Sequence, residues 1–175
     1  MTIKDNSIQL RKASTADADS IWSILQQAIE KRKVEGSAQW QDGYPNPTVV
    51  NRDIEKGYGY VCEDEQGDIT AYVALIFDIE PAYEALEGKW LTDGSYAVIH
   101  RLAVSQERNI KGLATKIMIA VEDICLQQGV PSIKVDTNFD NTAMLRILEK
   151  LGYTYCGEVF FRGAARKAYE KILNT

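Results

Sequence analysis

The sequence is poor in the residues that mark several common classes of protein. It has three cysteines, Cys62, Cys125 and Cys156, far apart and without the paired spacing of a zinc site or a disulfide framework. We therefore expect reduced core thiols and no metal. No apolar run is long enough to span a bilayer, and the first residues contain no apolar signal core. These absences predict a soluble cytoplasmic protein.

Basic residues are also in the minority. The chain has 20 Lys and Arg against 25 Asp and Glu, a formal net charge of −5. A general nucleic-acid-binding face needs an excess of basic residues, so no nucleic-acid partner is expected, although local basic residues can still bind one small anion. With 175 residues, 45% of them hydrophobic, and no low-complexity linker, residues 1–175 are predicted to form one domain.

The hydrophobic periodicity predicts strands and helices in one unit. Strands are expected at 7–13, 58–64, 69–79, 96–104, 132–137, 153–161 and 167–172. Helices are expected at 17–30, 48–56, 112–128 and 141–151. The segment 33–48 is interpreted as an irregular loop or a broken helix, and the segment 80–95, which also interrupts the pattern, as a loop. The elements favour an α/β protein of the α+β type, a single mixed sheet with helices on its faces.

The stretch "HRLAVSQERNIKGLATKI", residues 100–117, joins a strand to a helix through a polar loop. A helix that begins near Lys111 or Gly112 leaves its first N–H groups without intrahelical acceptors, and its dipole adds partial positive charge there. Gly112 allows close approach of a ligand to the backbone, and Arg108 and Lys116 add charge. A phosphate group is the expected ligand. The alternative is that Gly112 only eases a tight turn. Neither GxxxxGK[ST] nor GxGxxG is present.

Two motifs resemble those of the GNAT superfamily of acyl-CoA-dependent N-acyltransferases. "LAVSQERNIKGLA" is similar to the strand and pyrophosphate loop [Q/R]-x-x-G-x-[G/A], and "NTAMLRILEKLGY" is similar to the later helix that ends in Gly-[Phe/Tyr]. "IQLRKASTADADSI" resembles the usual first strand and helix, so the similarity spans nearly the whole chain. The resemblance implies a mostly antiparallel sheet of six to seven strands and acetyl-CoA as co-substrate.

The resemblance also implies a coenzyme site. The strand 102–104 would pair with the pantetheine arm, the segment 109–115 would hold the pyrophosphate through backbone N–H groups, and Asn141 would lie near the thioester. Asn109 stands where Gln or Arg is usual, which weakens that side-chain contact. The implied coenzyme-binding residues are Leu102, Ala103, Val104, Asn109, Ile110, Lys111, Gly112, Leu113, Ala114, Thr115, Asn138, Asn141 and Met144.

The single histidine, His100, is the candidate general base. A lone histidine in a strand is more often structural. In the arylalkylamine branch of the superfamily, however, a base histidine occurs in a similar H-x-L-A-V run, and His100 occupies the matching place. The rival bases lie in an acidic segment, which is more often only a solvated loop: Glu80, Glu84 and Glu87.

The proton donor for the leaving thiolate is less defined. Leu148 occupies the position of the tyrosine that many members use as acid, and leucine has no proton to donate. Tyr153 or Tyr155 is the candidate replacement, or the thiolate leaves without an acid.

The implied activity is acetyl transfer to a primary amine of a small molecule or an amino-acid-like acceptor. Four aromatic residues before the coenzyme strand either line the acceptor pocket or only pack the loops: Trp40, Tyr44, Tyr83 and Trp90. A peptide or protein N-acetyltransferase and a non-catalytic acyl-CoA sensor remain alternatives. No membrane partner is expected, and a homodimer is left open.

Overall fold

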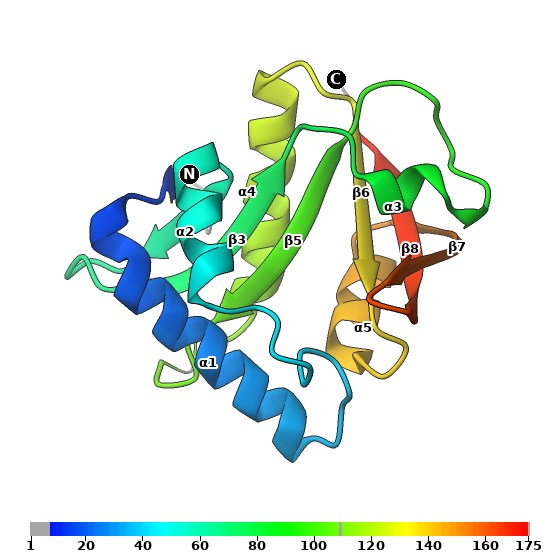
Figure 1. The fold of residues 1–175 in the computed structure, drawn as a ribbon. Helices are drawn as coiled ribbons and strands as arrows, with labels where there is room; N and C mark the ends of the chain where they lie inside the picture. The colour runs from blue at the N-terminus through cyan, green and yellow to red at the C-terminus, as the bar shows by residue number, and fades with distance from the viewer. Residues whose placement is uncertain (1–7, 109, 175) are drawn as a thin grey trace.

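The computed structural model describes residues 8–108 and 110–174, which form one eight-stranded sheet with helices on both faces (Figure 1). The strand order is β1-β2-β3-β5-β6-β8-β7-β4, and every pair is antiparallel except β5 with β6. The strands are β1 (Leu10–Lys12), β2 (Gly59–Glu63), β3 (Ile69–Ile76), β4 (Glu87–Gly88), β5 (Ala97–Val104), β6 (Ser132–Thr137), β7 (Thr154–Phe161) and β8 (Ala164–Ile172). This mixed α/β sheet confirms the predicted fold class.

The helices pack on opposite faces of the sheet. They are α1 (Ala18–Val34), α2 (Pro47–Lys56), α3 (Pro81–Glu84), α4 (Leu113–Gln127) and α5 (Thr142–Lys150), and a 3-10 turn at Thr15–Asp17 precedes α1. Ile21 and Leu25 of α1 pack with Tyr72 and Ala74, whereas Ile117 of α4 joins the cluster on the other face. The alternation of β3 thus supplies both cores, because successive side chains of a strand point to opposite faces.

The sheet divides between β5 and β6. These neighbours pair only at their first residues, Ala97–Ile99 with Ile133–Val135. Beyond that point the two strands diverge, as Figure 1 shows in the space between the green and yellow arrows. From His100 in β5 and from Asp136 in β6 onward, the two strands are therefore no longer joined by backbone pairing.

A bulge interrupts β5 at the start of this gap. Tyr72 pairs with Ala103 and Ala74 with His100, so Arg101 and Leu102 both lie opposite Val73. Arg101 has a φ of 55°, in the left-handed region. Such a bulge turns the side chains of its strand out of strict alternation. Consecutive residues of β5 therefore reach the same cavity.

Two short elements in the segment interpreted as a loop were not predicted. The helix α3 spans four residues, and the strand β4 spans two and adds an eighth strand at the edge beside β7. The expected count of six to seven strands was wrong for this reason, since a two-residue strand has too few side chains to establish an alternating pattern.

The loop after β4 is held by Glu170 of β8, which is completely buried. Its Oε1 accepts hydrogen bonds from the N–H groups of Leu91, at 2.7 Å, and Thr92, at 3.3 Å. Its Oε2 accepts from the hydroxyls of Thr92 and Ser132. Removal of this carboxylate would leave its donors buried without a partner.

We expect Glu170→Ala to lower the free energy of unfolding by about 3 kcal/mol, because it removes a buried hydrogen-bonded charge. Urea denaturation followed by circular dichroism measures the change. Glu149→Ala, at an exposed position on α5, is the matched control and is expected within about 0.5 kcal/mol of the original protein. Equal stability of the two variants would contradict a structural role for Glu170.

Candidate active site

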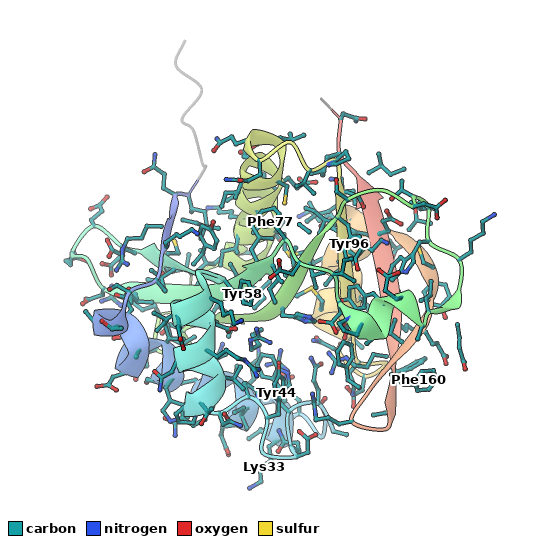
Figure 2. All side chains as sticks on the ribbon, turned by 45° about the horizontal axis from the view of Figure 1, so that its top comes forward. Lys33, Tyr44, Tyr58, Phe77, Tyr96 and Phe160 are labelled. Carbon is teal, nitrogen blue, oxygen red and sulfur yellow. The ribbon has the colours of Figure 1, made fainter. Side chains whose placement is uncertain are left out.

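A cavity of about 400 Å³ opens where β5 and β6 diverge. Two of its lining residues, Tyr44 and Tyr58, are labelled in Figure 2, where they lie between α2 and α3. The bulge brings His100, Arg101 and Leu102 to its wall. The cavity is also lined by Arg32, Trp40, Asp53, Asp78, Glu80, Asp136, Asn141, Met144, Arg162 and Arg166.

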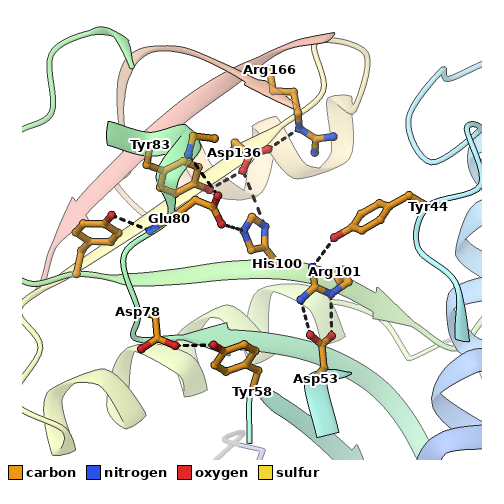
Figure 3. A network of polar contacts seen from close by, with 12 residues as sticks. Tyr44, Asp53, Tyr58, Asp78, Glu80, Tyr83, His100, Arg101, Asp136 and Arg166 are labelled. Atoms are coloured by element: carbon orange, nitrogen blue, oxygen red, sulfur yellow. Dashed lines mark hydrogen bonds and ion pairs between the residues drawn. The ribbon is translucent and has the colours of Figure 1, made fainter. Parts of the chain in front are cut away.

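His100 lies between two carboxylates in this cavity (Figure 3). Its Nε2 is 3.4 Å from Oε2 of Glu80, and its Nδ1 is 4.0 Å from Oδ1 of Asp136. The side chain of His100 is 15% exposed, so it is accessible from the cavity and still held in place. The hydrogen bond with His100 lowers the pKa of Glu80, which favours an ionised Glu80 carboxylate.

Asp136 is itself held by two donors. The hydroxyl of Tyr83 donates to Oδ1 at 2.5 Å, and Nε of Arg166 donates to Oδ2. Burial raises the pKa of Tyr83 well above its usual value, so this hydroxyl stays protonated and donates. Both carboxylate oxygens of Asp136 therefore have a hydrogen-bond donor, as a buried polar group needs.

Arg101 and Asp53 form another part of the cavity wall. The Nε and Nη2 atoms of Arg101 donate to the two carboxylate oxygens of Asp53 at 2.8 and 2.6 Å, and Nη1 donates to the hydroxyl of Tyr44 at 2.5 Å. Tyr72 adds a hydrogen bond to Asp53 at 2.6 Å. A bidentate pair of this kind fixes both planes, so it holds the bulge of β5 in one conformation.

A second cavity, of about 300 Å³, lies at the N-terminus of α4. Gly112 is the N-cap with a φ of 74°, and a Cβ placed on it would meet no atom within 4 Å, so it would project into open space. Leu113, Ala114 and Thr115, the first turn of α4, line the cavity; the N–H of Leu113 donates to the backbone oxygen of Ile110 at 3.4 Å, and those of Ala114 and Thr115 belong to the helix start that lacks intrahelical acceptors. This arrangement fits a pyrophosphate, which binds at such helix N-termini.

The positive charge of the second cavity comes from lysines more than from Arg108. The guanidinium of Arg108 is engaged with Asp64 and Asp68 of the β2–β3 turn. Lys31 and Lys111 line the cavity. Val104 belongs to this cavity and Leu102 to the larger one, so the last residues of β5 connect the two.

The structure brings together part of the predicted coenzyme residues. Leu102, Asn141 and Met144 line the larger cavity, and the second holds Val104 with residues 110–115. The Asn141 side chain accepts from the N–H of Met144 and donates to Gln39. Ala103 packs on the α1 face, and the Asn138 side chain donates to Asp140. The predicted contact of Asn109 lies outside the described residues.

The predicted aromatic residues separate into two groups. Trp40 and Tyr44 line the larger cavity, whereas Tyr83 lies behind Asp136, and Trp90 donates to the backbone of Tyr83.

The two candidate proton donors lie outside both cavities in the described part of the chain. Tyr153 packs in the core, where burial raises its pKa, and exposed Tyr155 stacks edge-on against Tyr169. Leu148, the position usual for the acid, is fully buried.

Several residues of the site were not found from the sequence. Asp136 lies in a short strand that read as an ordinary buried one, and Arg101 owes its place to a bulge that no pattern announced. A charged residue within a buried strand is the signal that marks both positions. Within the described residues, no group of three or more His, Cys, Asp and Glu side chains could hold a metal ion, and no helix has the length and hydrophobicity to cross a membrane.

Comparisons with known proteins identify the family and the fold. Residues 22–153 match the model of the acetyltransferase (GNAT) family. The chain is 36% identical to a GNAT-family acetyltransferase from Streptococcus agalactiae, with 96% of each chain covered and a TM-score of 0.86. A Listeria monocytogenes member is 20% identical over 99% of each chain, with a TM-score of 0.78. The search of curated proteins gave no match.

A third similar structure, of a Salmonella typhimurium protein, was solved with its cofactor acetyl-CoA. It is 18% identical, covers 97% of this chain and 96% of its own, and has a TM-score of 0.66. At that identity the likeness concerns the fold. The family match and the Streptococcus relative show that the chain belongs to the GNAT acetyltransferase family.

Proposed function

We propose that the protein transfers an acetyl group from acetyl-CoA to the primary amine of a small acceptor, with His100 as general base. The observation that carries the proposal is the place of His100, in the cavity between the diverging strands and on the strand that leads to the second cavity. The coenzyme, when bound, supplies a thioester carbonyl carbon that an amine can attack. The lining of the two cavities by Leu102 and Val104 supports a coenzyme that lies along β5.

His100 would remove the proton of the amine. Glu80 lies at Nε2, so in the neutral tautomer with hydrogen on Nε2 the lone pair is on Nδ1, toward Asp136. An acceptor ammonium group is attracted to the Asp136 carboxylate, which places it beside that lone pair. In this arrangement Glu80 and Asp136 are positioning residues, and His100 is the group that accepts the proton.

The bulge supports a role for the backbone of Leu102. An extra residue in one strand leaves part of the hydrogen-bond ladder unmade, so a backbone N–H at the bulge is available to donate to a ligand. We infer that the N–H of Leu102 stabilises the negative charge that develops on the carbonyl oxygen. The thiolate leaves without a protein acid, since a thiol is a good leaving group near neutral pH.

The proposal predicts both binding and turnover. At a concentration one hundred times its dissociation constant, acetyl-CoA should stabilise the protein by about 2.7 kcal/mol, a rise in melting temperature of roughly 5–10 °C. Thiol release and product mass should show acetylation of members of a panel of amino acids, polyamines, arylalkylamines and peptides. A melt unmoved by millimolar acetyl-CoA would remove the coenzyme from the proposal, and turnover confined to peptides would exclude a small acceptor.

A further inference from the structure

The larger cavity has an uneven distribution of charge. Six of its lining side chains are cationic and four are carboxylates, although the whole chain carries a formal net charge of −5. Glu80 and Asp136 flank His100, whereas the guanidinium groups of Arg32, Arg162 and Arg166 come from α1, the β7–β8 turn and β8. One part of the cavity is therefore suited to a cation and another part to an anion.

Most of these charges already have partners in the described residues. Arg101 is paired with Asp53, Arg166 with Asp136 and Arg162 with Asp42. Of the carboxylates, Asp78 accepts from the hydroxyl of Tyr58 and Glu80 contacts His100. Each carboxylate that lines the cavity therefore has a partner, whereas some of the lining cationic side chains have no carboxylate partner among the described residues.

Arg32 is a half-buried cation of the cavity that forms no ion pair among the described residues. Its guanidinium lies over the ring of Trp40, 4.0 Å from the centroid, and Nη1 donates to the backbone oxygen of Ala28 at 3.2 Å. Its Nε is buried with no hydrogen-bond partner among the described residues. Burial and the nearby guanidinium of Arg166 lower the pKa of Arg32 to about 10, against the smaller opposing effect of the carboxylates of Glu35 and Asp140, so the side chain remains charged at neutral pH.

We propose that the acceptor carries a carboxylate as well as its amine, and that Arg32 binds this carboxylate within the cavity that contains His100. The inference rests on the proposed function and narrows its acceptor to zwitterions such as amino acids. A carboxylate at the Arg32 guanidinium would offset the repulsion between Arg32 and Arg166. The amine would then face Asp136 and His100, in the part of the cavity that carries negative charge.

The remaining nitrogens of Arg166 extend this binding site. Arg166 uses Nε for Asp136, and Figure 3 shows its guanidinium beside the space that His100 and Tyr44 also face. A residue that holds Asp136 with one nitrogen and lies near Arg32 joins the two ends of the cavity. The fixed distance between those ends makes the separation of amine and carboxylate the property that the site selects.

The test compares each amino acid with its own amide. For methionine and methioninamide, and for phenylalanine and phenylalaninamide, kcat/KM is measured with the original protein, Arg32→Met and Lys33→Met. The ratio of acid to amide should fall roughly 10-fold or more in Arg32→Met, the size expected for one charge-assisted hydrogen-bonded contact. Comparing ratios between variants cancels the different reactivities of the two amines.

Lys33→Met is the matched control, because it removes one positive charge from the same turn of α1. Lys33 is exposed, is not among the residues of either cavity, and projects away from the molecule in Figure 2. Its acid-to-amide ratio should equal that of the original protein. A fall of the same size in both variants would indicate a general charge effect and overturn the proposal, as would an unchanged ratio in Arg32→Met.

Binding can be measured without turnover. In thermal melts with CoA present, N-acetylphenylalanine should protect the original protein more than N-acetylphenylalaninamide does, and Arg32→Met should lose that difference. Equal protection by acid and amide would overturn the proposal, and so would no protection by either. Turnover confined to amines that lack a carboxylate would overturn the proposal and leave the acetyl transfer intact, whereas failure of acetyl-CoA to bind would contradict the proposed function itself.

Discussion

His100→Ala is expected to lower kcat by about 10²-fold or more, while the stabilisation by acetyl-CoA is retained. The imidazole lies in the larger cavity, and the residues that line the second cavity do not include it. Its loss should therefore affect proton removal and leave coenzyme binding unchanged. Steady-state kinetics with saturating acetyl-CoA, together with thermal melts, measure the two effects separately.

The pH profile distinguishes a base from a packing residue. A base acts in its deprotonated form, so the rate of the original protein should rise with pH at the acidic end. The acceptor amine also deprotonates as pH rises, and this part should persist in His100→Ala. A variant with near-normal kcat and an unchanged profile would assign His100 to packing.

Two nearby carboxylates provide the controls. Glu80→Gln removes the contact with Nε2 and should lower kcat less than His100→Ala does, because the base itself remains. The control is Glu84→Gln: Glu84 is the last residue of α3, whose N-cap is Glu80, and its carboxylate accepts from the hydroxyl of Tyr96 outside the larger cavity. Its kcat should stay near normal. If Glu80→Gln were the slower enzyme, Glu80 would be the base.

Gly112→Glu is expected to abolish the thermal stabilisation by CoA. A side chain at this position enters the open space of the second cavity and carries negative charge to the place where a pyrophosphate would bind. The backbone also has a φ of 74°, which costs a non-glycine residue about 1–2 kcal/mol. Melts with and without CoA measure the effect on binding apart from the effect on stability.

Gly129→Glu is the matched control for this backbone cost. Gly129 follows the other end of α4, has a φ of 73°, and a Cβ on it would also meet no atom within 4 Å. Both variants should therefore lose comparable stability. Only Gly112→Glu should lose the response to CoA, so normal CoA binding by Gly112→Glu would mean that the glycine serves the turn alone.

The sequence identified the parts of the site that depend on local pattern. The strand before residue 104, the helix that begins at residue 113 and the glycine between them follow from periodicity and from the backbone needs of a helix start. His100 was found because histidine is rare here and its strand was clear. The resemblance to the GNAT superfamily suggested acetyl-CoA as the ligand.

The rest of the site depends on contacts between segments far apart in sequence. Arg32 and Asp53 lie on helices whose charged residues looked like solvent-facing ones, and Asp136 acquires its role only when β6 lies beside β5. The bulge at Arg101 has no local signal because its stabilising partner is 48 residues away. Side-chain pairing of this range cannot be inferred from one sequence.

The short pairing of β5 with β6 has a consequence for the mechanics of the domain. Three residue pairs are all that the ladder provides between β1-β2-β3-β5 on one side and β6-β8-β7-β4 on the other. A molecule bound between the diverging ends of β5 and β6 contacts both parts of the sheet and so links them. Binding of coenzyme and acceptor should therefore slow amide hydrogen exchange in β5 and β6. The two parts of the sheet become more rigid relative to each other as the site fills.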